Sequence, residues 1–372
     1  MKLAGVELRR IAMPLVSPFR TSFGTQTSRE LLLVRVETSE GEGWGECVTM
    51  EDPVYSSEYT DAAVDVLRGH LIPALAACPD LDPWRVAPAL AHIKGHRMAK
   101  GALEAAVLDA WLRARSVSFG SWLGATTDRV PAGVSVGIMD SIPALLDAVE
   151  GYLAEGYRRI KLKIEPGWDI APVAAVRERF GDSVPLQVDA NTAYTVGDAA
   201  HLARLDEFGL LLIEQPLDEE DLRGHARLAA TVRTPICLDE SIVSARSAAD
   251  AIALGACSIV NIKPGRVGGY LEARRIHDVC AAHGVPVWCG GMLETGLGRA
   301  ANVALAALPG FTLPGDTSAS GRYYRTDITE PFVLEDGHLR VPSGPGLGVD
   351  PDPGRLAEVT VSTEWVTGAG PA

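Results

Sequence analysis

The 372-residue sequence lacks long runs of apolar residues. No window approaches the length of a membrane-spanning helix, and the opening MKLAGVELRRIAMPL has no apolar segment long enough for a signal peptide. Basic runs that would offset the formal charge of −14 are also missing, which disfavours binding to nucleic acid or to an anionic membrane. We therefore expect a cytoplasmic protein.

Paired cysteines are missing as well. The six cysteines have no CxxC spacing, and several lie inside apolar runs such as PICLDE and VWCGG. This pattern is typical of buried thiols in a reducing compartment, and it disfavours both disulfides and a cysteine-based metal site.

The chain is long enough for one large domain and a smaller one. In the part from 126 to 320, apolar β-rich runs alternate with stretches of helical period, a pattern that predicts a parallel sheet with helical crossovers. Eight such runs fit a (β/α) barrel. An open doubly wound sheet is the alternative, and it is disfavoured because no glycine-rich fingerprint follows the first strand. The runs cover residues 130–138, 158–164, 185–191, 210–216, 235–241, 258–264, 286–292 and 311–317.

The two ends of the chain read differently. Residues 1–125 combine strand patterns with Ala-rich helical segments, which predicts an α+β capping domain with exposed loops at 17–25 and 47–53. Residues 321–372 contain a hairpin pattern followed by a Gly/Pro-rich tail, and we expect this segment to pack back on the cap.

Five ionisable residues end consecutive predicted strands of the barrel: Lys163, Asp189, Glu214, Asp239 and Lys263. They are separated by steps of 26, 25, 25 and 24 residues. Because the carboxyl ends of parallel strands meet at one mouth of a barrel, all five side chains are expected to converge. Three carboxylates suit Mg²⁺, which prefers oxygen ligands. The alternative is that they are unrelated solvated acids near loop starts.

The two lysines are predicted to move protons. Burial and a neighbouring dication both lower the pKa of an ammonium group, towards the range of a working base. A substrate carboxylate on the metal would present its α-carbon between Lys163 and Lys263, so one amine removes the α-proton and an enediolate forms. Lys161 shares a strand face with Lys163 and is expected to hydrogen-bond a ligand or the bound carboxylate. A purely structural ion pair is the alternative role for Lys163.

Several motifs together carry a family resemblance. The chain resembles the muconate-lactonising subgroup of the enolase superfamily and, within it, the o-succinylbenzoate synthase / N-acylamino acid racemase family, over essentially its whole length. The resemblance implies a modified TIM (β/α)7β-type barrel with an N-terminal α+β capping domain completed by the C-terminal segment. The motifs are KLK at 161–163, DAN at 189–191, EQP at 214–216, DES at 239–241 and NIKPGRVGG at 261–269.

The resemblance also implies roles for individual residues. Lys163 and Lys263 would be the acid/base pair. Asp189, Glu214 and Asp239 would hold Mg²⁺, for which Mn²⁺ or Co²⁺ substitutes, and the enzyme would be a homo-oligomer. The residues implied around the metal and the lysines are Lys161, Asn191, Glu240, Ser241 and Arg266. Those implied in a substrate pocket between cap and barrel are Phe19, Met50, Ser135, Gly291, Leu293 and Tyr323.

The implied activities are racemisation of N-succinyl and N-acetyl amino acids and dehydration to o-succinylbenzoate in menaquinone biosynthesis. Racemisation needs both lysines, whereas dehydration can use Lys163 alone. The positive charge of Arg266, three residues after Lys263, is expected to lower the pKa of Lys263 and so to favour racemisation.

Other activities stay open. They are a dipeptide epimerase, for which Asp316 would bind the substrate's ammonium group, a cycloisomerase, a sugar-acid dehydratase, a metal-free Schiff-base aldolase, and a non-catalytic binding protein.

Overall fold

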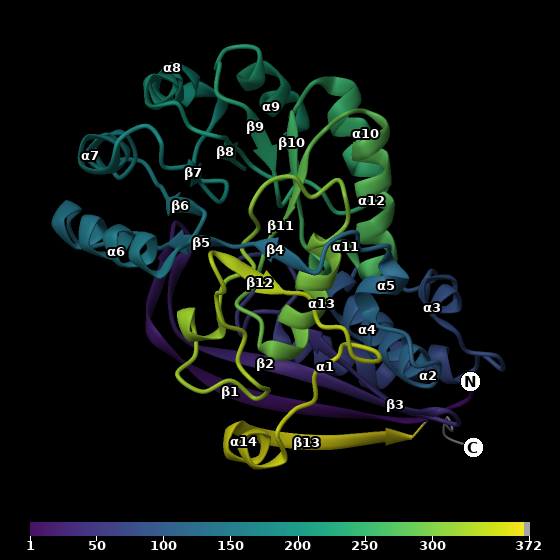
Figure 1. Cartoon of the computed structure of the whole chain (residues 1–372). Coiled ribbons are helices and arrows are strands. Elements are labelled where there is room, and N and C mark those ends of the chain that lie inside the picture. Colours follow the sequence, from purple (N-terminus) through teal and green to yellow (C-terminus); the bar gives the residue numbers. More distant parts are fainter. Residues whose placement is uncertain (368–372) are drawn as a thin grey trace.

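The computed structural model describes residues 1–367, which form a curled sheet of seven parallel strands and a separate antiparallel cap sheet (Figure 1). The parallel strands follow the order β5-β6-β7-β8-β9-β10-β11, and Figure 1 shows helices α6, α7, α8, α9, α10 and α12 on their outer side. The predicted architecture, an α/β barrel with an α+β cap, is confirmed. The barrel elements are β5 (Gly133–Val136), α6 (Ile142–Glu155), β6 (Arg159–Lys163), α7 (Ile170–Phe180), β7 (Leu186–Asp189), η2 (Val196–Asp198), α8 (Ala199–Leu202), η3 (Ala203–Phe208), β8 (Ile213–Glu214), α9 (Leu222–Ala229), β9 (Ile236–Leu238), α10 (Ala245–Leu254), β10 (Ile259–Ile262), α11 (Pro264–Val267), α12 (Tyr270–Ala282), β11 (Val287–Cys289) and α13 (Gly296–Ala306).

Strand β6 illustrates how the sequence builds the barrel. Successive side chains of a strand point to opposite faces. Ile160 and Leu162 are fully buried in the apolar core, while Lys161 and Lys163 lie on the other face, inside the barrel. Each strand can therefore contribute apolar side chains to the core and polar ones to the barrel interior.

The eighth run, residues 311–317, does not form a regular strand. It closes the gap between β11 and β5 only through isolated bridges, Phe311 with Val287 and Gly315 with Ala132. Pro314 has no N–H to donate, which explains why a continuous ladder does not form. The first run, 130–138, is likewise divided into β5 and a short strand, β4 (Arg129–Pro131), which pairs outside the barrel.

The cap is a four-stranded antiparallel sheet in the order β13-β1-β2-β3, packed against helices. Gly45 allows the closest approach, because a Cβ there would lie 2.1 Å from the carbonyl oxygen of Ala102 on α4. Residues 17–25 were predicted to be an exposed loop, but most of them extend β1 and β2, and Phe19 pairs with Gln26. The cap elements are β1 (Leu3–Thr21), β2 (Gly24–Thr38), β3 (Gly41–Cys47), α1 (Thr60–Val66), η1 (Leu67–Leu71), α2 (Ile72–Ala76), α3 (Pro83–Leu90), α4 (Arg97–Arg113) and α5 (Phe119–Leu123).

The C-terminal segment returns to the cap, where β13 (Thr360–Thr367) pairs with β1 (Figure 1). The predicted hairpin is reduced to a tight turn, in which Asp336 and Gly337 both have positive φ, of 50° and 75°. Its second arm, β12 (His338–Arg340), pairs with β4 instead. The remaining elements are η4 (Ser320–Arg322) and α14 (Pro353–Val359). Domain boundaries at 125/126 and 320/321 stay predictions.

Candidate active site

The five spaced ionisable residues lie at the carboxyl ends of consecutive strands. Lys163, Asp189 and Glu214 are the last residues of β6, β7 and β8, while Asp239 and Lys263 directly follow β9 and β10. Lys163 is in register with Asp189, which is in register with Glu214. Parallel pairing therefore brings these side chains to one end of the barrel.

The charges of this group are buried and paired. The Nζ of Lys163 is 2.6 Å from Asp189 Oδ2, and the Nζ of Lys263 is 2.7 Å from Asp239 Oδ2. Lys161 lies between two carboxylates, with its Nζ 3.1 Å from Asp189 Oδ2 and 3.0 Å from Glu214 Oε2. Each predicted metal-binding carboxylate is thus within ion-pair distance of a lysine.

A polar network fixes the residues around the lysines. Lys163 also donates to Asn191 Oδ1 at 2.6 Å, and Asn191 donates through Nδ2 to Glu240 Oε1 at 2.8 Å. Gln215 donates to Ser241 Oγ at 2.8 Å, and its own Oε1 accepts the backbone N–H of Asp239 at 3.0 Å. These bonds leave the side chains little freedom to rotate.

Backbone strain is concentrated at the same end of the barrel. Four non-glycine residues in the loops that follow barrel strands have positive φ: Asn191 (42°), Thr192 (66°), Gln215 (35°) and Leu293 (59°). Such conformations are unfavourable for residues with a Cβ and persist where surrounding contacts hold them, often at functional sites. The carbonyl of Leu293, for example, accepts a hydrogen bond from Tyr324 Oη.

Arg266 lies beside Lys263 and one of the predicted metal ligands. Its guanidinium contacts Asp239 Oδ1, while Lys263 approaches Oδ2 of the same carboxylate. Arg266 also donates to the carbonyls of Ile242 at 2.9 Å and Asn261 at 2.8 Å. It therefore shares a counter-ion with Lys263.

The sequence predicted a lowered lysine pKa on the assumption of a neighbouring dication. Without that ion, the protein groups around Lys263 raise its pKa instead. Burial acts to lower the pKa of Lys263, but Tyr55 and the carboxylates of Glu240, Glu214 and Asp189 together outweigh it and raise the pKa. At Asp189, burial acts to raise the pKa, and the ammonium groups of Lys163 and Lys161 hold it below its usual range. Opposite charges thus outweigh desolvation at Lys263 and Asp189, whereas burial prevails at Glu214 and raises its pKa.

The carboxylates have the chemistry of a site for a hard cation but are not preassembled as one. Among residues 1–367, no three His, Cys, Asp or Glu side chains are gathered so that they could hold a metal ion. Asp239 is fully buried, and its two oxygens are met by the charged groups of Lys263 and Arg266. The ammonium of Lys161 already bridges Asp189 and Glu214 as a cation. Three buried carboxylates fit Mg²⁺ if the lysines move aside.

A cavity of about 50 Å³ lies beside these groups, and Lys163 and Lys263 both line it. Four of the six predicted substrate-pocket residues line it too: Phe19, Met50, Gly291 and Leu293. A cavity of this size holds only a few atoms, so the surrounding side chains must move to admit a substrate.

The other two predicted pocket residues do not line this cavity. Tyr323 contacts Phe19 edge to face, with 6.1 Å between their ring centroids. Ser135 is buried on β5, where its carbonyl oxygen accepts a hydrogen bond from Arg322.

Two family models match the chain. The mandelate racemase / muconate lactonizing enzyme N-terminal domain matches residues 4–124, and the enolase C-terminal domain-like model matches residues 144–355. The chain belongs to this family of enolase-superfamily enzymes. The family predicted from the sequence motifs is thereby confirmed.

Relatives along nearly the full length of this enolase-superfamily chain carry three names. A protein from Amycolatopsis named N-succinylamino acid racemase is 74% identical, covering 98% of this chain and 100% of the relative. An o-succinylbenzoate synthase from Geobacillus kaustophilus is 50% identical and covers 93% of each chain. The L-Ala-D/L-Glu epimerase of Bacillus subtilis is more distant, at 30% identity over 94% of this chain and 97% of the relative. A solved enolase-superfamily structure from Listeria innocua has a TM-score of 0.95 and 39% identity, covering 99% of this chain and 100% of that one.

Cap residues that the sequence reasoning missed also line the cavity. Lys263 donates to Tyr55 Oη at 3.1 Å, and its Nζ lies 4.7 Å from the centroid of that ring. The sequence predicted exposed loops at 17–25 and 47–53 but not which side chains reach the barrel. The lining residues not predicted are Thr21, Phe23, Gln26, Arg29, Tyr55 and Met292.

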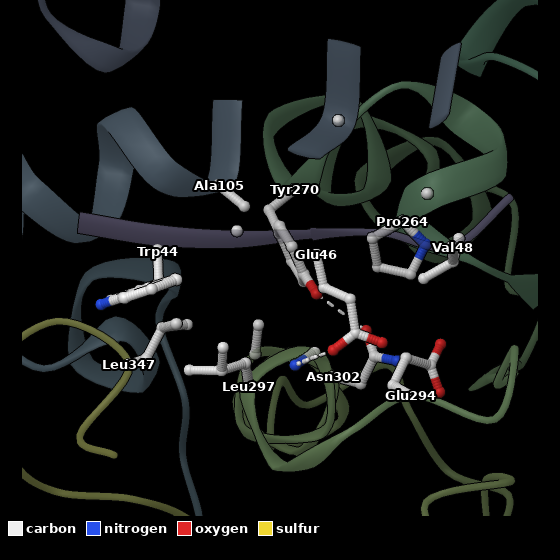
Figure 2. A pocket seen from close by; sticks show the side chains of 15 residues that line it. Trp44, Glu46, Val48, Ala105, Pro264, Tyr270, Glu294, Leu297, Asn302 and Leu347 are labelled. Carbon is white, nitrogen blue, oxygen red and sulfur yellow. Dashed lines mark hydrogen bonds between the residues drawn. The ribbon is translucent and has the colours of Figure 1, made fainter. Parts of the chain in front are cut away.

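A smaller cavity of about 20 Å³ lies where β3 and α4 of the cap meet the barrel (Figure 2). Glu46 and Glu294 line it, and Tyr270 donates to Asn302 Oδ1 at 2.9 Å. Its volume is that of roughly one water molecule. Neither lysine of the candidate active site lines it, so it belongs to the packing between cap and barrel.

Finally, none of the helices in the described part of the chain combines the length and apolar character needed to cross a bilayer.

Proposed function

We propose that this protein racemises N-acylamino acids, N-succinyl derivatives in particular, and that it also forms o-succinylbenzoate by dehydration. The observation that carries the proposal is that Lys163 and Lys263 line one cavity, each paired with a different buried aspartate. Full-length identity of 74% to a protein named N-succinylamino acid racemase supports the first activity, and 50% identity to a named o-succinylbenzoate synthase supports the second.

Asp189, Glu214 and Asp239 would hold Mg²⁺, or Mn²⁺ or Co²⁺ in its place. When bound, the ion would neutralise the substrate's carboxylate and so make its α-hydrogen more acidic. The lysines contribute the proton transfers: one amine takes the α-proton, and the opposite amine delivers a proton to the other face. Asn191 orients Lys163, and Tyr55 contacts Lys263 from the cap side.

The geometry around Asp316 disfavours the dipeptide epimerase. A substrate with a free ammonium group needs an unengaged acid, but Asp316 is within 2.9 Å of Arg159 NH1 and 2.6 Å of Lys161 Nζ. Both oxygens of this carboxylate are therefore engaged. An N-acylated substrate, whose nitrogen carries no charge, requires no such acid.

The test follows α-proton exchange in deuterated water with N-succinyl and N-acetyl amino acids of both configurations. Turnover of the cyclohexadiene substrate of o-succinylbenzoate synthesis is measured in parallel. Lys163→Ala and Lys263→Ala should each lower the rate of racemisation by about 10²-fold or more. Each variant should lose α-proton exchange with one configuration of the amino acid and retain exchange with the other. Lys94→Ala, at an exposed position of the cap, is the matched control and should be fully active.

Three results would count against the proposal. Wild-type protein that exchanges no α-proton would exclude racemisation. Exchange of both configurations that survives in each lysine variant would exclude the two-base mechanism. Borohydride trapping of substrate on a lysine, with activity retained in chelator, would support the Schiff-base alternative.

We also propose a cytoplasmic location and a homo-oligomeric state. The motif resemblance supports the latter, and size-exclusion chromatography with light scattering tests it.

A further inference from the structure

Lys161 is a buried cation with three acidic partners. Its Nζ lies 2.6 Å from Asp316 Oδ2, 3.0 Å from Glu214 Oε2 and 3.1 Å from Asp189 Oδ2, and its side chain is 2% exposed. Two of these carboxylates are the proposed metal ligands. The third, Asp316, gives the shortest contact and is not among the proposed ligands.

Asp316 is held in place independently of the metal ligands. Its Oδ1 accepts from Arg159 NH1 at 2.9 Å, and its backbone N–H donates to the carbonyl of Cys289 at 2.9 Å. Arg159 is fully buried, donates to the carbonyl of Pro314 at 2.8 Å, and lies 5.2 Å from the ring centroid of Trp288. Asp316 is therefore a fixed negative charge beside a lysine whose other partners are proposed to change.

We propose that Asp316 is a positioning residue that remains the counter-ion of Lys161 when a divalent cation displaces the ammonium from Asp189 and Glu214. The inference rests on the proposed function. Lys161 and a metal ion compete for the same oxygens, and a buried ammonium cannot give up its partners without another counter-charge. Asp316 supplies that charge at the contact Lys161 already makes.

The predicted effect is on metal affinity and can be measured without turnover. In Asp316→Asn, Lys161 retains only the two proposed ligands, and a metal ion must displace it from both. Mn²⁺ binding to the purified full-length protein, followed by the electron paramagnetic resonance signal of free Mn²⁺, should weaken by about 10-fold or more.

The matched control is Asp327→Asn, which removes a buried carboxylate in the C-terminal segment. Asp327 is 3% exposed and accepts from the N–H of Gly296 at 2.9 Å and from Ser320 Oγ at 2.6 Å, with no recorded contact to Lys161. Asp327→Asn should leave the Mn²⁺ affinity unchanged. Equal weakening in both variants would show a general effect of lost charge or stability and would overturn the proposal.

A second comparison separates two ways in which Asp316 could affect metal affinity: through its contact with Lys161, or through its own negative charge. In a Lys161→Met background no ammonium competes for the ligands, so adding Asp316→Asn should then leave Mn²⁺ affinity nearly unchanged. If Asp316→Asn weakens binding equally with and without Lys161, Asp316 does not act through that lysine and the inference is wrong.

Thermal unfolding checks that each variant is folded. If Asp316→Asn does not fold, Asp316→Glu retains the charge but moves the carboxylate, and weaker Mn²⁺ binding is again expected. An unchanged affinity in that variant would overturn the proposal. Failure of the wild type to bind Mn²⁺ would overturn the proposed function and this inference with it. Equal binding by wild type and Asp316→Asn would overturn the inference alone.

Discussion

Glu46 provides a stability prediction at the contact between cap and barrel. It lies on β3 of the cap, and its carboxylate accepts from the N–H of Thr295 at 3.1 Å, from Thr295 Oγ1 at 2.6 Å and from the N–H of Gly298 at 3.1 Å. These donors belong to the N-terminus of α13, whose first-turn amides have no partner within the helix. A cap residue therefore completes the end of a barrel helix (Figure 2).

Burial, with a smaller contribution from the charge of Glu294, raises the pKa of Glu46 to about 8, although the hydrogen bonds from Thr295 act in the opposite direction. The ordinary value is 4.5, so between these two values the folded protein retains a proton that the unfolded chain has lost. Stability must then fall as pH rises through this window. One such group changes the free energy of unfolding by at most about 1.4 kcal/mol per pH unit.

Glu46→Gln removes this titration. Between about pH 5.5 and about pH 7.5, the free energy of unfolding of wild type should fall relative to the variant by up to about 3 kcal/mol. Urea unfolding of both proteins across this range measures the difference. Glu42→Gln, at an exposed position on the same strand, is the matched control and should show no such trend. A difference between wild type and Glu46→Gln that does not depend on pH would refute the reasoning.

Two further substitutions test the active site and the cap. Arg266→Gln leaves Lys263 as the one remaining charged partner of the Asp239 carboxylate in the described part of the chain. Because racemisation needs Lys263 to transfer protons, its rate should fall more than the rate of dehydration. Equal losses in the two assays would contradict this. Gly45→Ala places a Cβ 2.1 Å from a carbonyl oxygen of α4 and should lower the free energy of unfolding by about 1–3 kcal/mol. Gly151→Ala on α6 meets no atom within 4 Å and should instead stabilise slightly, so a comparable loss there would argue against the steric explanation.

The repeating pattern of strands and helices allowed the barrel to be predicted from the sequence. Even spacing of charged residues at strand ends was informative, because parallel pairing converts regular spacing along the chain into proximity in space. Lys163, Asp189 and Glu214 are near one another for this reason. The same pattern failed at 311–317, where Pro314 and the adjacent Gly315 allow only isolated bridges.

Contacts that depend on long-range packing could not be predicted. Tyr55 reaches Lys263 from a loop of the cap, 208 residues away in sequence, and nothing in the local composition indicates that direction. The engagement of Asp316 by Arg159 and Lys161 likewise depends on how the barrel closes. The lowered pKa of Lys263 was predicted for a site with a dication and stays a prediction; in the protein alone, acidic groups contributed by other strands and by the cap raise this pKa.

The central claim is that a divalent cation held by Asp189, Glu214 and Asp239 enables two opposed lysines to exchange the α-proton of an N-acylamino acid. The most direct measurement is the rate of α-hydrogen exchange of an N-succinylamino acid in deuterated water, with chelator-treated enzyme before and after addition of Mg²⁺. We predict no exchange above background before addition and full recovery afterwards. Undiminished exchange by strictly metal-depleted enzyme would contradict the account.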